Sequence, residues 1–236
     1  MWLRNTLISL TLAATASLPA FASSALTPYE ATYKIMRKGK ALGVGTRSLT
    51  KAGDLYTLHN ASDLSWLIFT DQREESSTFQ VENQHINPAS YDFKRTGTGP
   101  DEKEKMTFDG NTVKSDKNSL TLKGPAYDPL TYQQQLAMDL AAGKKDVSYD
   151  IVKDLKIKHY HFKVVGEERI TTPYGAVDTL RVERVRGKNS SRHTLFWLAP
   201  KLHYALVRLW QAKDNVEQME LVLSEYHDKG QTTSAQ

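Results

Sequence analysis

The chain has 236 residues and no cysteine, and its 31 Lys and Arg residues against 27 Asp and Glu residues give a formal net charge of +4. The absence of cysteine excludes disulfide frameworks, thiolate zinc sites and cysteine nucleophiles. A content of 39% hydrophobic and 25% charged residues is typical of a soluble globular protein. The basic excess is small and lies among acidic residues, so we expect no nucleic acid as a partner.

Residues 1–22 have the pattern of a secretory signal peptide. Arg4 precedes an apolar stretch from Leu7 to Leu18, and Ala20-Phe21-Ala22 is the small-x-small pattern that signal peptidase recognises. We predict cleavage between Ala22 and Ser23, which leaves 214 residues with a net charge of +3. The apolar stretch is shorter than the roughly 20 residues of a membrane span. We therefore expect a soluble periplasmic protein without a transmembrane anchor.

From Pro28 onward, short segments with alternating apolar and polar residues predict β-strands. Tyr29, Ala31, Tyr33 and Ile35, for example, share one face of the first strand. This spacing predicts an all-β protein with a single antiparallel curved sheet that closes into a barrel-like or β-roll architecture. Residues 29–64 are predicted as a three-stranded meander, and the further strands are expected at 72–82, 90–96, 102–109, 111–115, 119–123, 147–153, 156–165, 168–172, 176–186, 192–198, 203–211 and 215–226.

One helix is predicted near residues 129–142. Asp128 suits the N-cap, Pro129 suits the first helical position, and Gly143 ends the segment. Gln133, Gln134 and Gln135 are interpreted as the solvated face of this helix. We expect one β-domain over 23–226, followed by a disordered polar tail over 227–236.

Few residues indicate chemistry. The common catalytic and nucleotide-binding motifs are missing from the sequence, so we assign no catalytic residue, expect no enzyme activity and expect no cofactor. His159 and His161 are alternate residues of one predicted strand, so both imidazoles would point the same way. They are weak candidates for a metal site because two ligands need a third, and exposed strand histidines are the more ordinary interpretation.

Trp66-Leu67-Ile68-Phe69 is a run of four large apolar residues between two predicted strands. Because alternate strand residues point to opposite faces, one buried face cannot accept the whole run. A strand covered on both sides, or a corner, would explain the run structurally. The other interpretation is a hydrophobic lip at the mouth of a barrel or a docking patch, in which Trp66, Leu67 and Phe69 bind a ligand or partner.

A second group of candidate binding residues lies in the C-terminal third: Trp197, Tyr204, Arg208 and Trp210. Arg208 is in phase with aromatic residues on an otherwise apolar stripe, so its guanidinium needs a partner. Glu183 and Glu220 are the candidate partners if Arg208 is structural. Otherwise Arg208 would bind an anion, such as a lipid headgroup or an acidic sugar, inside an apolar cavity.

Several segments together resemble a known family. They are Thr172-Pro173-Tyr174-Gly175, the run from Thr194 to Pro200, the opening strand from Tyr29 to Tyr33, and Asp128-Pro129-Leu130. They resemble the exported bacterial proteins of domain-of-unknown-function family 3108. The resemblance implies a periplasmic protein of Gram-negative bacteria with a curved or barrel-like antiparallel sheet. It supplies no catalytic residues.

Three functions remain open from the sequence. The first is a non-enzymatic binder of an apolar or amphipathic envelope molecule, such as a lipid. The second is an adaptor or regulator of envelope assembly that acts through another envelope protein. The third is a hydrolase of envelope polysaccharide. Periodicity does not separate a filled interior from a hollow one, because the predicted inward residues are mixed: Tyr33, Thr46, Asn60 and Arg208.

Overall fold

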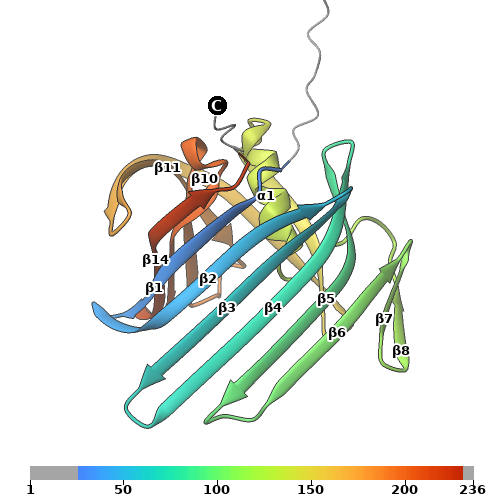
Figure 1. Ribbon diagram of the computed structural model, residues 1–236, viewed down its shortest axis with the longest axis horizontal. Coiled ribbons are helices and arrows are strands. Elements are labelled where there is room, and N and C mark those ends of the chain that lie inside the picture. The colour runs from blue at the N-terminus through green and yellow to red at the C-terminus, as the bar shows by residue number, and fades with distance from the viewer. Residues whose placement is uncertain (1–25, 231–236) are drawn as a thin grey trace, which may run out of the picture.

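The computed structural model describes residues 26–230, and in the order of the chain these form fourteen strands and one α-helix (Figure 1). The predicted signal peptide with its Ala22-Ser23 cleavage site, and residues 231–236, lie outside the described residues. The elements are β1 (Tyr29–Arg37), β2 (Lys40–Ala52), β3 (Leu55–Trp66), β4 (Phe69–Glu82), β5 (His85–Gly97), β6 (Glu102–Asp109), β7 (Thr112–Ser115), β8 (Asn118–Thr121), α1 (Thr131–Ala141), β9 (Asp146–Lys153), β10 (Lys156–Thr172), β11 (Gly175–Val185), β12 (Arg192–Ala199), the 3-10 turn η1 (Pro200–Leu202), β13 (Ala205–Lys213) and β14 (Val216–Asp228).

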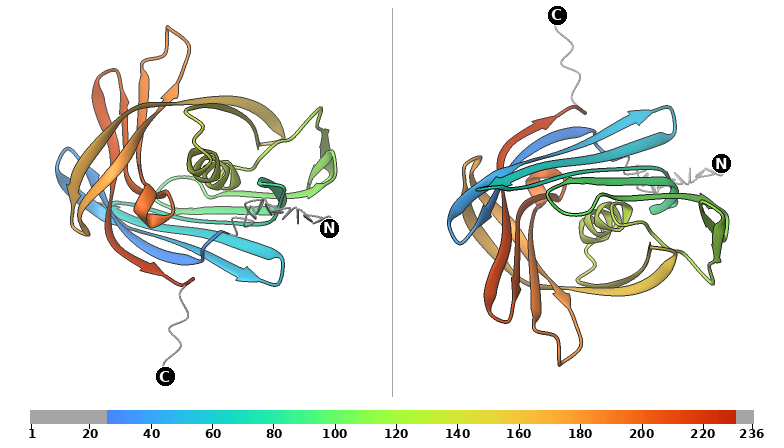
Figure 2. Two further views of the ribbon diagram at one scale, coloured as in Figure 1. Left: turned by 90° about the horizontal axis from the view of Figure 1, so that it is seen from above. Right: turned by 90° about the horizontal axis from the view of Figure 1, so that it is seen from below.

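All fourteen strands belong to one antiparallel sheet, in the order β8-β7-β6-β5-β4-β3-β2-β1-β14-β13-β12-β11-β10-β9. The sheet bends so that β1–β6 form one wall and β9–β14 form the other, with α1 between them (Figure 2). We call these the N-terminal and C-terminal walls. The prediction of a single curved antiparallel sheet is therefore confirmed.

Closure into a barrel is not observed. β8 and β9 are the two edges of the sheet, and they are not paired with each other. The chain before the helix instead covers part of the β9 edge, because the Tyr127 N–H donates to the Asp150 carbonyl at 2.9 Å and the Val152 N–H donates to the Tyr127 carbonyl at 2.8 Å. This segment satisfies edge groups that barrel closure would otherwise pair.

The core lies between the concave face of the sheet and α1. Tyr29, Ala31, Tyr33 and Ile35 are buried along β1, as the alternation predicts. On the opposite wall Phe162 stacks on Tyr132 of the helix, with ring centroids 5.7 Å apart. Both walls thus bury their inward residues against the same helix.

The prediction that Gln133, Gln134 and Gln135 form a solvated helix face is wrong for Gln134 and Gln135, which are buried. The sheet encloses α1, so its polar side has no access to bulk water and must find partners within the protein. Gln135 accepts a hydrogen bond from the Ile86 N–H at 2.9 Å and donates to the Gln84 carbonyl at 3.1 Å. These bonds attach the helix to the turn between β4 and β5.

Asp128 organises the start of α1, although the helix itself begins at Thr131 rather than at the predicted residue 129. Its carboxylate accepts hydrogen bonds from the N–H groups of Leu130 and Thr131 at 2.8 and 2.9 Å, and the Thr131 hydroxyl accepts one from the Asp128 N–H at 3.0 Å. Ser77 of β4 donates to the same carboxylate oxygen at 2.8 Å. The N-cap position is thus Leu130 and not the predicted Asp128, but the Asp128 carboxylate accepts from the N–H groups at the start of the helix and joins it to the N-terminal wall.

Two of the differences between the predicted and the observed strand boundaries concern how the sheet is built. Residues 156–165 and 168–172 are one strand, β10, because Gly166 lies at a register shift in the pairing with β11 and forms no turn. A glycine within a strand commonly marks such a bulge. At the other end, β14 continues to Asp228, opposite Tyr29, so the first two residues of the predicted tail over 227–236 are part of the sheet.

Within residues 26–230, no helix is long and apolar enough to cross a membrane.

Replacement of Asp128 tests its structural role. Asp128→Ala should lower the free energy of unfolding by about 1–3 kcal/mol, because the first N–H groups of α1 and the Ser77 hydroxyl lose their acceptor. Asp128→Asn keeps one acceptor oxygen and should cost less. Thermal unfolding followed by circular dichroism measures both changes, and equal midpoints for the wild type and Asp128→Ala would contradict this structural role.

Candidate functional site

The apolar run that the sequence analysis singled out forms the turn between β3 and β4. Leu67 has a positive φ of 55°, and both Leu67 and Ile68 are 82% exposed, while Phe69 is 54% exposed. Trp66 pairs with Phe69 across the hairpin, but its side chain lies outside the described part of the structure. The two residues at the turn are therefore not buried by the rest of the described chain.

Arg208 has structural partners. Its Nε donates to Glu220 Oε1 at 2.6 Å, and its guanidinium lies 4.5 Å from the centre of the Trp197 ring. The indole N–H of Trp197 donates to Glu168 at 3.0 Å, and Trp197 is only 4% exposed. The structure thus supports the structural interpretation of Arg208. Its partner is Glu220, one of the two glutamates that the sequence analysis suggested.

The four C-terminal candidates do not meet in one site. Trp197 and Arg208 are cross-strand neighbours, whereas the Trp210 indole donates to Glu217 at 3.2 Å. Tyr204 follows η1 with a positive φ of 57°, outside the strand in which it was predicted. A strand over 203–211 would have placed Tyr204 on the same face as Arg208 and Trp210. This does not hold for Tyr204, because β13 begins only at Ala205.

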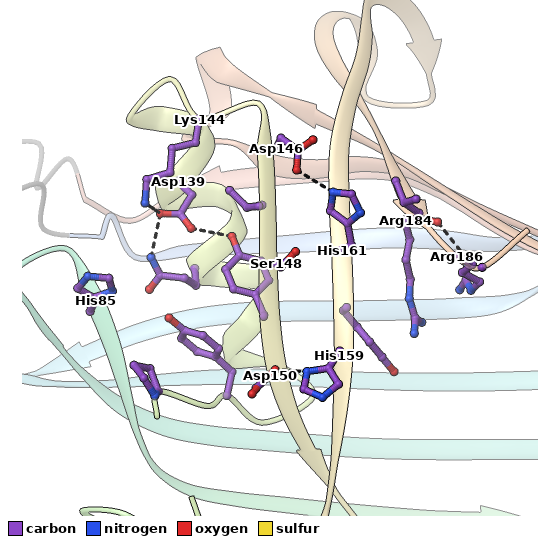
Figure 3. A pocket seen from close by; sticks show the side chains of 18 residues that line it. His85, Asp139, Lys144, Asp146, Ser148, Asp150, His159, His161, Arg184 and Arg186 are labelled. Atoms are coloured by element: carbon purple, nitrogen blue, oxygen red, sulfur yellow. Dashed lines mark hydrogen bonds and ion pairs between the residues drawn. The ribbon is translucent and has the colours of Figure 1, made fainter. Parts of the chain in front are cut away.

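His159 and His161 lie on the face of β10 away from α1, since Phe162 beside them packs against the helix. Each histidine faces one carboxylate: His159 contacts Asp150, and His161 Nε2 lies 2.7 Å from Asp146 Oδ1 (Figure 3). They border a surface depression of about 890 Å³. No group of three or more potential metal ligands is found within residues 26–230.

A more enclosed cavity, which the sequence did not reveal, lies between β1–β4 of the N-terminal wall and β13–β14 of the C-terminal wall. Its volume is about 320 Å³. We call it the inner cavity. Most of its apolar lining is aliphatic and comes from both walls: Ile35, Leu64, Leu206, Leu209, Met219 and Leu221. Arg208 is not part of it, because it points to the face of β13 opposite Leu209.

One end of the inner cavity, beside α1, is polar. Arg47, Asn60 and Glu75 are cross-strand partners on β2, β3 and β4, so their side chains form one row on the concave face. Gln133 of α1 faces the same space. The helix therefore closes the polar end, and the aliphatic residues lie further along the strands.

Arg47 is the most buried charged member of this row, with 8% of its surface exposed. Its Nε donates to the Tyr29 hydroxyl at 2.9 Å, and its Nη1 donates to Gln133 Oε1 at 2.7 Å. Both acceptors are neutral, and within residues 26–230 no carboxylate forms an ion pair with this guanidinium. Arg47 thus carries a buried positive charge whose partners are hydrogen-bonding groups alone.

The concave face also holds polar atoms without partners. Among the described side chains, the buried oxygen or nitrogen atoms that lack a hydrogen bond are Asn60 Oδ1, Glu104 Oε2 and Asp128 Oδ2. Asn60 lines the inner cavity. Glu104 of β6 extends the same cross-strand row, because Glu75 pairs with Phe93 of β5 and Phe93 pairs with Glu104. Buried polar atoms without partners are rare and call for a specific explanation.

The carboxyl groups of this region share one electrostatic property. Burial raises the pKa of Glu75, and it does the same for Glu104 and Asp128. The positive charges of Lys153, Arg73 and Arg47 act in the opposite direction on the pKa of Glu75 without cancelling the effect of burial. The concave face therefore favours the neutral form of its carboxyl groups.

Comparison with known proteins identifies the family. A family model matches residues 28–222, from just before β1 into β14. The chain belongs to the DUF3108 family, described as a protein of unknown function. The family inferred from the sequence is thereby confirmed, and export stays a prediction. No curated protein matches this DUF3108 chain significantly.

Among solved structures, the crystal structure of MucB is similar to the DUF3108 chain at 9% sequence identity and a TM-score of 0.33. The match covers 86% of this chain and 54% of MucB, so this chain spans about half the length of MucB.

The sequence carried a weak signal for the polar row. Arg47 is in phase with Leu49 on β2, and Glu75 and Ser77 are in phase with Phe79 on β4, so polar residues interrupt two otherwise inward-facing series. Asn60 was expected to point inward, and it does. Alternation alone did not show that these residues are neighbours, because neighbouring strands can pair in several registers.

The raised pKa of Glu75 predicts a pH-dependent stability. A carboxyl whose pKa is higher in the folded state than in the unfolded state destabilises the fold as the pH rises through the folded value. Glu75→Gln, which cannot ionise, should therefore raise the unfolding midpoint at pH 7.5, by about 2–4 °C for each kcal/mol gained. The gain should shrink at pH 4, where the wild-type carboxyl is already protonated.

Glu74→Gln is the matched control, because Glu74 is the exposed neighbour on the opposite face of β4 and should change the midpoint little at either pH. A lower midpoint for Glu75→Gln at pH 7.5 would contradict the expected penalty.

Proposed function

We propose that this protein is a non-enzymatic binder of an amphipathic molecule of the bacterial envelope, which it holds in the inner cavity. One observation carries the proposal: a cavity of about 320 Å³ combines an aliphatic lining with a polar end at which the buried Asn60 Oδ1 has no hydrogen-bond partner. Ligand pockets have volumes of roughly 300–1,000 Å³ and combine apolar walls with a few placed polar groups.

The two parts of the lining suit the two parts of an amphipathic ligand. Ile35, Leu64 and Leu221 offer aliphatic surface, on which burial of an alkyl chain gains about 25 cal/mol per Å². Asn60 places a polar amide beside this surface, and its oxygen accepts no hydrogen bond in the structure.

The buried cation at the polar end supports binding. The Arg47 guanidinium is held by Tyr29 and Gln133. Such bonds keep the side chain in place beside a ligand.

A variant that fills the inner cavity tests this function. Ser62 lines the cavity on β3, so Ser62→Trp should place an indole in the space that a ligand would occupy. N-phenyl-1-naphthylamine, a neutral dye that fluoresces in apolar surroundings, should bind the wild type, and the variant should bind it at least about 10-fold more weakly, a loss of about 1.4 kcal/mol.

Ser65→Trp is the control for this experiment, because Ser65 is an exposed serine on the opposite face of the same strand. It should leave dye binding unchanged. Equal dye affinities for Ser62→Trp and the wild type would exclude the inner cavity as the binding site.

The proposed location is the periplasm. The Arg4, Leu7–Leu18 and Ala20-Phe21-Ala22 pattern supports it, and these residues precede the described part of the structure. When the full chain is expressed in a Gram-negative bacterium, osmotic-shock fractions should contain a protein whose mass corresponds to a chain that begins at Ser23. Retention of uncleaved chain in the cytoplasm would overturn this location.

The hairpin turn between β3 and β4 favours a second candidate function, an adaptor that contacts another envelope protein. Leu67 and Ile68 are 82% exposed, and such apolar side chains at a surface can serve as contact points for a partner. The cavity-filling Ser62→Trp variant separates the two functions. An adaptor that acts through the turn does not need the inner cavity, whereas the proposed binder loses its ligand.

A further inference from the structure

We infer that the ligand of the inner cavity has an anionic headgroup, a carboxylate or a phosphate, and that Arg47 binds this group. The inference rests on the proposed function and makes it more specific. It assigns Arg47 as the residue that selects for charge and the aliphatic residues as the contact surface for the alkyl part.

The first argument is the missing counter-charge. Arg47 is 8% exposed, and the groups around it are hydroxyls and amides: Tyr29, Tyr33 and Tyr132, with Gln133. Burial raises the pKa of the Tyr33 and Tyr132 hydroxyls, so they stay neutral beside the guanidinium. A buried charge is costly unless an opposite charge accompanies it.

Glu75 is not paired directly with Arg47. It belongs to the same row, but β3 lies between β2 and β4, so two strand spacings of about 4.8 Å separate the two backbones. Within residues 26–230, Glu75 forms no ion pair with Arg47, and although Arg47 is among the positive charges that lower the pKa of Glu75, burial outweighs them and raises it. The space between Arg47 and Glu75 borders the inner cavity.

The second argument is the number of free donors. A guanidinium has five N–H groups, and the structure assigns one on Nε to Tyr29 and one on Nη1 to Gln133. Three N–H groups of Arg47 remain for a ligand. Two N–H groups of a guanidinium can bind the two oxygens of one carboxylate or phosphate, an arrangement that is stronger and more directional than a single bond.

The third argument is the direction in which an alkyl chain would leave this site. Along the strands from the polar row, the concave face presents Gly45 and Ser62 and then Ile35 and Leu64. Gly45 has no side chain, and the aliphatic side chain of Ile35 lies beside it, since a Cβ at this position would be 3.6 Å from Ile35 Cδ1. The chain would therefore extend from Arg47 past Gly45 and Ser62, with Tyr33 and Arg73 at the two ends of that cross-strand row, toward the aliphatic part of the cavity.

Dye displacement with three probes of equal chain length tests the inference: decanoate, decyl phosphate and decan-1-ol, each below its micellar concentration at pH 7.5. In the wild type, the two anions should displace N-phenyl-1-naphthylamine at concentrations at least about 10-fold lower than decan-1-ol does. In Arg47→Met this preference should fall below about 3-fold, while the affinity for decan-1-ol should change less than about 2-fold.

Arg169→Met is the matched control, because Arg169 is an exposed arginine paired with Asp178 and the variant changes the net charge equally. It should retain the full preference for anions. Arg47→Lys keeps the charge without the two-pronged geometry and should retain a reduced preference. It serves if Arg47→Met does not fold.

The outcomes separate the two levels of the proposal. Dye binding with equal displacement by decan-1-ol and both anions would overturn the role of Arg47 and leave the cavity function in place. Failure of the wild type to bind the dye or any probe would overturn the cavity function itself. If decanoate alone shows the preference, the headgroup is a carboxylate such as that of a fatty acid; if decyl phosphate alone shows it, the headgroup is a lipid phosphate.

Discussion

The sheet must cover a helix whose own polar groups cannot reach water, and the rest of the structure depends on this constraint. Because β1–β6 and β9–β14 bend around α1, the helix has almost no solvated side. Its polar side chains must therefore bond to the walls. Gln135 bonds to the β4–β5 turn, Gln133 to Arg47 of β2, and Asp128 to Ser77 of β4. These bonds fix where the helix lies between the walls.

The position of the helix creates the inner cavity. α1 occupies one part of the space between the two walls, and its first turn ends at the polar row. Beyond that point the side chains of the two walls leave a space of about 320 Å³ between β1–β4 and β13–β14. A closed and fully packed barrel would have no comparable space beside Arg47. The open arrangement of β8 and β9 therefore accompanies a hollow region of the fold.

Much of the fold followed from local patterns in the sequence. The alternation of buried and exposed residues in β1, the turn residues between strands and the family motifs were sufficient to predict an all-β protein with one antiparallel sheet and one helix. Asp128 was recognised from its place before Pro129 and Leu130 as a residue that bonds to the start of the helix, although Leu130 holds the N-cap position. Each of these features depends on neighbouring residues, and neighbours in the chain are visible in the sequence.

The candidate site did not follow from such patterns. Arg208 attracted attention because it lies among aromatic residues, yet Glu220 neutralises it on the adjacent strand. Arg47 attracted none, although it is the buried arginine without a carboxylate partner in the described residues. The difference between these two arginines lies in which residues surround them across the sheet.

The sequence by itself determined the secondary structure, the family and the inward or outward phase of many strand residues, because these depend on chain-local periodicity and on turn chemistry. Only the tertiary structure decided that the sheet stays open, that the glutamines of α1 are buried, and that Arg47, Asn60 and Glu75 form one row. Those features depend on register and on the bending of fourteen strands around a helix. Register and curvature are properties of contacts between distant residues, and alternation along one strand does not specify them.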